Sequence, residues 1–220
     1  MALILRRLIA IACIVPLFAG MLGAAEALVV ETEGTVEIRR SAGDEWAALE
    51  EETIVPTGAT ISTGFGARAV LEVGPTARLH VDALTRITLE ELIEQEGLVE
   101  SDIELSVGRV RGEVRTDRDT ETDFQLQGPV ATASVRGTSF EFDGVNLSVS
   151  EGQVRFSNRF NQRVSVRQGE RSSTTGDDPP PSGDQSREAD SNVNIYTAGV
   201  EERTESEITG RESDNATLRV

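Results

Sequence analysis

The alternation of apolar and polar residues from Leu28 to about Gly176 is the feature that most constrains how this chain can fold. Apolar residues two positions apart recur in ten short segments, most of them bounded by Gly, Asp, Asn or Pro. This is the period of a β-strand that buries one face, and short strands separated by turn residues are typical of all-β domains. The sequence therefore predicts one all-β domain over residues 28–176. The ten pairs are Val36/Ile38, Leu71/Val73, Leu79/Val81, Ile87/Leu89, Ile103/Leu105, Phe124/Leu126, Phe140/Phe142, Leu147/Val149, Val154/Phe156 and Val164/Val166.

Three of these pairs also repeat in register, because Leu71, Leu79 and Ile87 are eight residues apart. A unit of about five extended residues and a tight turn cannot bury its own apolar face, so such units must stack or pair. A meander of hairpins would give the same period. We predict a small solenoid-like stack of short strands and tight turns.

The segment Leu89–Gly97 has apolar residues at two spacings. Leu89, Leu92 and Ile93 have the spacing of a helix, whereas Ile87 and Leu89 have that of a strand. We predict a turn-rich excursion here.

The N-terminal 27 residues have the pattern of a targeting segment. Arg6 and Arg7 precede an apolar run over 8–25, and Ala25-Glu26-Ala27 supplies the small residues that a signal peptidase reads. We predict a signal peptide over residues 1–27, cleaved after Ala27, and export to the periplasm, or to the cell surface or medium, of a bacterium. A retained membrane anchor is the alternative, and contact with a membrane would come only through that uncleaved segment.

After Gly176 the composition changes. Residues 177–220 begin with Asp177-Asp178-Pro179-Pro180-Pro181 and hold 11 acidic residues and 4 Arg with almost no apolar clustering. Such a segment cannot bury enough apolar surface to fold, so we predict a disordered acidic tail. Within it, the segment 193–196 is a candidate edge strand.

Charge and composition exclude several classes of function. The net charge is −17, which repels phosphate backbones and excludes a nucleic-acid partner. The chain has one His, one Cys and no Lys, so it lacks the residues of most metal, haem and Schiff-base sites. His80 stands outside any triad motif. We therefore predict no catalytic residue and no cofactor.

Five motifs in order resemble the FecR domain, the periplasmic sensing part of the ferric-citrate regulator family. The most specific is 129–140, which ends in Ala133-Ser134-Val135-Arg136-Gly137-Thr138-Ser139-Phe140 and is similar to the family's Ala, x, Val, Arg-Gly-Thr, x, Phe signature. The segment 149–154 follows it and resembles Val-x-Glu-Gly-x-Val. The earlier elements are 55–64, 69–81 and 106–110.

The resemblance implies an all-β, extracytoplasmic domain that binds a protein or ligand of the envelope and has no catalytic activity. Complete regulators of this family carry a cytoplasmic anti-sigma segment before one membrane helix, whereas only a few residues precede the apolar run here. We expect a stand-alone exported FecR-like domain that acts as an envelope sensor or interaction module. A structural or glycan-binding surface protein is the alternative.

Arg136, Gly137 and Thr138 are the candidate binding residues, and we expect them to have a structural role. Counted back from Phe140, Thr138 and Arg136 share the inward parity, so Arg136 would be buried and paired unless Gly137 introduces a bulge. Loss of a buried, paired Arg136 would cost about 3–5 kcal/mol.

Four carboxylates on alternate residues form a candidate calcium set, namely Asp117, Asp119, Glu121 and Asp123. Thr122 and Gly128 occupy positions where a calcium loop of the EF-hand type needs Gly and Glu. We therefore predict a solvated acidic loop and no metal.

Overall fold

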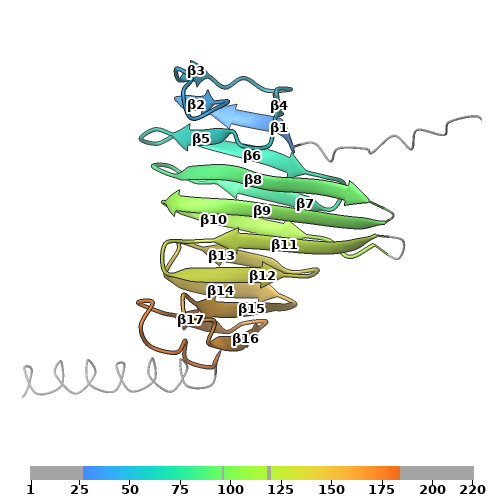
Figure 1. Cartoon of the computed structure of the whole chain (residues 1–220), viewed down its shortest axis with the longest axis vertical. Coiled ribbons are helices and arrows are strands. Elements are labelled where there is room, and N and C mark those ends of the chain that lie inside the picture. Colours follow the sequence, from blue (N-terminus) through green and yellow to red (C-terminus); the bar gives the residue numbers. More distant parts are fainter. Residues whose placement is uncertain (1–26, 96, 118–119, 184–220) are drawn as a thin grey trace, which may run out of the picture.

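All regular structure in the described residues consists of β-strands. The structure is a computed structural model that describes residues 27–95, 97–117 and 120–183. The strands follow one another down a long axis, from β1–β4 at one end of the molecule to β16 and β17 at the other (Figure 1). No helix in this part of the chain is long and apolar enough to cross a membrane.

The strands form two open sheets. In the eight-stranded sheet the order is β17 (Arg171–Ser173), β14 (Asn146–Glu151), β13 (Ser139–Phe142), β10 (Val110–Val114), β7 (Ala77–Val81), β6 (Arg68–Val73), β1 (Ala27–Glu33) and β4 (Ile54–Val55). In the nine-stranded sheet it is β16 (Arg163–Arg167), β15 (Gln153–Asn158), β12 (Ala131–Val135), β11 (Glu121–Gln127), β9 (Leu98–Val107), β8 (Arg86–Gln95), β5 (Thr60–Thr63), β2 (Val36–Arg39) and β3 (Ala47–Ala48).

The two sheets enclose one hydrophobic core, to which both contribute alternate residues. Two aromatic contacts cross it: the ring centroids of Phe124 and Phe140 lie 6.3 Å apart, and those of Phe142 and Phe156 lie 6.1 Å apart. Successive hairpins along the chain alternate between the two sheets. A single strand, β10, separates β9 from β11 along the chain, which is why those two neighbours run parallel while the other pairs of described strands are antiparallel.

The all-β prediction is confirmed. All ten apolar pairs lie in strands, and of their twenty residues only Val164 is partly rather than fully buried. The eight-residue repeat has a different origin from the predicted one. Leu71 pairs directly with Leu79 across the β6–β7 hairpin, whereas Ile87 lies in β8 of the other sheet. One step is a hairpin and the next is a crossover, so the solenoid-like stack is not confirmed.

The predicted turn-rich excursion at 89–97 is wrong up to residue 95. This segment completes β8, which pairs with β9 over its full length. The register shifts between Leu89 and Glu91, and Glu90 and Glu91 are both exposed between the buried Leu89 and Leu92. A β-bulge therefore places two apolar residues three apart, which imitates the spacing of a helix.

The described residues also reach past both predicted boundaries of the domain. Ala27, where cleavage is predicted, is fully buried and pairs with Val55 and Val73. The first seven residues of the predicted tail run beside β17, where the hydroxyl of Ser172 donates to the carbonyl of Pro181 at 2.7 Å. The apolar run before Ala27 and residues 184–220 lie outside the described residues, so the signal peptide and the tail stay predictions.

Candidate functional site

The segment from Arg136 to Thr138 carries the chain from β12 to β13, and so from one sheet to the other. The expectation that Arg136 points inward is wrong. Its side chain is 65% exposed, and one guanidinium nitrogen lies 2.9 Å from a carboxylate oxygen of Glu121. Parity counted back from Phe140 fails because Val135 enters the core from the opposite sheet, so the crossover resets the alternation at Arg136.

Gly137 and Thr138 fix this crossover. Gly137 has φ +61°, and a Cβ there would lie 1.9 Å from the hydroxyl oxygen of Thr116. Thr138 is buried, exchanges two 2.9 Å backbone hydrogen bonds with Val114, and donates its hydroxyl to the carbonyl of Gln153 at 3.0 Å. Gly152 packs against the same residues, because its Cβ would lie 2.6 Å from the carbonyl oxygen of Gly137. Two of the sequence motifs therefore meet here, and of the three crossover residues only Arg136 is exposed.

Beside Arg136 lies an open groove of about 910 Å³ on the outer face of the nine-stranded sheet. It follows β11, β12, β15 and β16, and its walls are the side chains that alternate with the core residues of these strands. The strand register places them in rows across the sheet. One row is Gln125, Ser134, Arg155 and Ser165, and the next is Gln127, Thr132, Ser157 and Arg163.

The groove is basic although the protein is strongly acidic. Its described lining holds four arginines, Arg136, Arg155, Arg159 and Arg163, and one acid, Asp123. Arg136 pairs with Glu121 and Arg159 pairs with Asp177. Arg155 is exposed, and within the described part of the chain it has no ion pair. An Arg that projects from a strand into an open groove presents a planar fork of donors suited to a carboxylate.

The acidic side of the same sheet begins one strand away. Glu100, Asp102 and Glu104 on β9 align with Asp123, Gln125 and Gln127 on β11. At this boundary the Gln127 amide donates to both oxygens of Asp102, at 2.9 and 2.7 Å. Burial raises the pKa of Asp102, the Gln127 hydrogen bond lowers it, and Glu91 raises it further, so the net pKa lies above its ordinary value.

The candidate calcium residues do not gather into a described cluster. Glu121 is bound to Arg136, and Asp123 lines the groove. Asp119 lies outside the described residues, and Asp117 already interacts with another group. Within the described ranges no three or more His, Cys, Asp or Glu side chains are placed to hold a metal ion.

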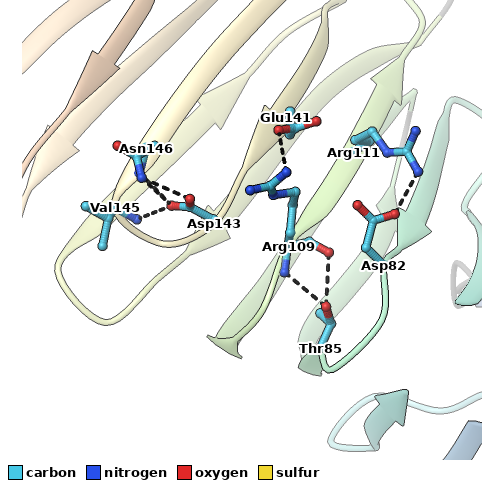
Figure 2. Close-up of polar contacts among 8 residues, drawn as sticks. All are labelled: Asp82, Thr85, Arg109, Arg111, Glu141, Asp143, Val145 and Asn146. Carbon is cyan, nitrogen blue, oxygen red and sulfur yellow. Dashed lines mark hydrogen bonds and ion pairs between the residues drawn. The ribbon is translucent and has the colours of Figure 1, made fainter. Parts of the chain in front are cut away.

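A second polar cluster lies at the turn ends of the eight-stranded sheet, around a hollow of about 630 Å³ (Figure 2). Arg111 pairs with Asp82 at 2.7 Å, and Arg109 pairs with Glu141 at 3.3 Å. The hydroxyl of Thr85 accepts the backbone N–H of Arg109 at 3.0 Å. Gly108, with φ +98°, packs so closely that a Cβ would lie 2.4 Å from the Cα of Thr85.

The carboxylate of Asp143 belongs to the same cluster and ties the β13–β14 turn. It accepts the backbone N–H groups of Val145 at 3.0 Å and Asn146 at 2.7 Å, together with the Asn146 side-chain amide. Burial raises the pKa of Asp143, but these hydrogen bonds and the charge of Arg109 lower it more, so its net pKa lies below the ordinary value. Both arginines and their acids are paired with one another, which identifies the cluster as a brace for the turns.

Sequence reasoning did not find the groove residues Arg155 and Arg163. The available signal was their position between core residues, since Arg155 lies between Val154 and Phe156 and Arg163 precedes Val164. That pattern predicts outward side chains. It does not reveal that β15 pairs with β12 on one side and β16 on the other, which is what brings the arginines together.

The described strands form an open, two-sheet all-β domain with a basic groove on one face. Residues 59–155 match the family model described as FecR protein, a span that runs from β5 into β15. This span is therefore similar to the FecR domain, as the order of the sequence motifs predicts.

Two crystal structures of a protein assigned as an anti-sigma factor in Parabacteroides distasonis ATCC 8503 are similar to this chain, with TM-scores of 0.45 and 0.44 and 18% sequence identity. Each likeness covers 56% of this chain and 58% of the other, so the chain spans a little more than half the length of those proteins. No curated protein matches the chain.

Proposed function

We propose that this chain is a non-catalytic interaction module of the bacterial envelope, acting as a sensor that captures a protein or ligand in signalling. The observation that carries the proposal is the groove of the FecR domain, in which Arg155 projects without an ion pair among the described residues. An unpaired arginine in an open polar groove has donors to offer a ligand, whereas the paired charges of the turn cluster satisfy one another.

The proposal includes the organisation predicted from the sequence. Residues 1–27 are a signal peptide, 28–176 form the FecR-like domain with its elongated, solenoid-like succession of strands, and 177–220 are an acidic tail. The domain acts in the periplasm or at the cell surface. A glycan-binding role has less support, because the described groove lining contains no aromatic side chain on which a sugar ring could stack.

Site-specific photo-crosslinking in the envelope tests this function. A benzoylphenylalanine probe replaces Ser134 in the groove or, as the matched control, Ser148 on β14 of the other sheet. Both serines are half-buried strand residues. We expect a discrete crosslinked envelope protein from position 134 that is absent at position 148. The same products at both positions, or none from 134, would argue against a signalling module that works through the groove. Retention on isolated cell-wall polysaccharide would favour the glycan-binding alternative.

A further inference from the structure

We propose that the groove binds an acidic peptide segment in extended conformation, which adds as a strand to the open edge of β16 and directs its carboxylates to Arg163 and Arg155. The inference rests on the proposed function and specifies the chemistry of the partner. Four observations carry it: the open edge, its contrast with the edge at β17, the placement of the arginines and the charge of the groove.

β16 ends the nine-stranded sheet, with β15 on its inner side. Hydrogen bonds from Gln168 to Gly152 and from Asn158 to Gln162 fix which backbone groups of β16 face β15. In an antiparallel pair these groups alternate, so those of Val164 and Val166 face β15 and those of Arg163 and Ser165 face outward. Among the described residues no backbone group bonds to Arg163 or Ser165 on that side.

The edge of the other sheet, at β17, is covered by another segment of the chain. At β17, the segment 177–183 runs alongside, with Ser172 bonded to Pro181 and Thr174 bonded to Asp178. At β16, among the described residues, only Arg167 has an outward backbone group that is hydrogen-bonded: its N–H donates to the Glu170 carboxylate at 2.8 Å. A strand edge with unpaired N–H and C=O groups is a template for pairing with another chain.

The arginines are placed to specify the side chains of an added strand. Arg163 and Ser165 lie two residues apart on the groove face, and Arg155 lies directly across from Ser165. Adjacent strands are about 4.8 Å apart, so Arg155 can extend over the small Ser165 to a residue of the new strand. An acidic residue opposite Arg163 and another opposite Ser165 would each meet a guanidinium group.

The residue between these two acids would be apolar. It would point to the side of the sheet where Val164 is only partly buried and Val166 is fully buried. The recognised segment is therefore acidic, apolar, acidic in sequence. Charge complementarity favours it, because the net charge of the protein is −17 whereas the described groove lining holds four arginines and one acid.

Titration of the full chain with the peptide Glu-Val-Glu-Val-Glu-Val-Glu-Val, by calorimetry at low salt, tests the proposal. We expect binding that weakens as salt is added, and weaker binding by about tenfold in Arg155→Glu and in Arg163→Glu. The matched control is Arg40→Glu, an exposed arginine in the loop after β2 with the same change of charge, which should bind as wild type does. Ser165→Pro removes the outward N–H without changing charge and should weaken binding as well.

Four other results would each distinguish between strand addition, a general anion site, binding of the chain's own tail and the proposed function alone. Equal binding of the isomer Glu-Glu-Glu-Glu-Val-Val-Val-Val, or tighter binding of polygalacturonate, would overturn strand addition and leave a general anion site. Binding only after residues 184–220 are removed would assign the groove to this chain's own tail and overturn an external partner. A peptide that fails to bind while the Ser134 crosslink persists would reject this inference and leave the proposed function standing. Circular dichroism identifies variants that do not fold. If Ser165→Pro is one of them, the test is made on the wild-type protein, in which the NMR amide signals of Arg163 and Ser165 must shift when the peptide is added.

Discussion

The turn cluster around Thr85 and the groove around Arg155 both gather arginines and acids, but they use them differently. In the turn cluster Arg109 and Arg111 each form an ion pair with an acid, and backbone N–H groups of the turns donate hydrogen bonds to Thr85 and Asp143 (Figure 2). In the groove the arginines outnumber the acids, and two of them, Arg155 and Arg163, project from regular strands. The comparison teaches that paired charges at turns stabilise this fold, whereas surplus charge on a sheet face leaves donors for a ligand.

Gly108→Ala should have the largest effect, because it disrupts the turn cluster. In Gly108→Ala the new Cβ meets Thr85 at 2.3–2.4 Å, and the residue must hold φ +98°. Steric overlap and backbone strain together should lower the free energy of unfolding by about 3–5 kcal/mol, measured by urea denaturation. Gly43→Ala is the control, because nothing lies within 4 Å of its added Cβ, and it should change stability by less than about 0.5 kcal/mol. Equal midpoints for both variants would contradict the brace.

Removal of one hydroxyl sharpens the same comparison. Thr85→Val leaves the part-buried N–H of Arg109 without its acceptor, which should cost about 1 kcal/mol in the free energy of unfolding. Thr132→Val in the groove removes a half-buried hydroxyl for which no hydrogen bond is found in the described chain, and should cost less than about 0.5 kcal/mol. Thermal or urea unfolding of both proteins measures the difference, and a larger loss in the groove variant would reverse our assignment.

Asp143 in the turn cluster and Asp102 at the acidic boundary of the groove should give opposite responses to pH. The pKa of Asp143 is lowered in the fold, so its contribution is present above its ordinary value of about 3.9 and is lost as pH falls through the lowered pKa. The pKa of Asp102 is raised, so its contribution is present at low pH and is lost as pH rises through the raised pKa. At neutral pH, Asp143→Asn should therefore destabilise the protein and Asp102→Asn should stabilise it. Urea midpoints from about pH 3 to about pH 7 test both signs, and a shared sign would contradict the assignment.

Much of the fold follows from local pattern, and the remainder depends on which strands meet. Pairs such as Val154 and Phe156 reveal strands because burial on one face imposes a period of two. The spacing of Leu89 and Leu92 does not reveal the strand, because the bulge between them depends on the partner strand β9, which the local sequence does not contain. The groove depends in the same way on β11, β12, β15 and β16 lying side by side, an order fixed by packing between distant segments.

Arg136 shows where local parity fails, and it gives the smallest predicted effect. A buried Arg136 would make Arg136→Ala cost about 3–5 kcal/mol, but the side chain is 65% exposed and its partner Glu121 is 62% exposed. Solvent screens such a pair, so the variant should lose less than about 0.5 kcal/mol of unfolding free energy, and the coupling to Glu121→Ala in a double-mutant cycle should stay below about 1 kcal/mol.

Binding should respond more than stability does in this variant. Arg136 lines the end of the groove, but its charge is already shared with Glu121, so Arg136→Ala should weaken the acidic peptide less than Arg155→Glu does. Calorimetry on the folded variant measures this ranking. A loss of unfolding free energy above about 2 kcal/mol would show that Arg136 stabilises the crossover, because exposed ion pairs rarely exceed about 1 kcal/mol. The residue would then belong with the turn cluster, and the division between bracing and binding charges would have to be drawn beyond Arg136.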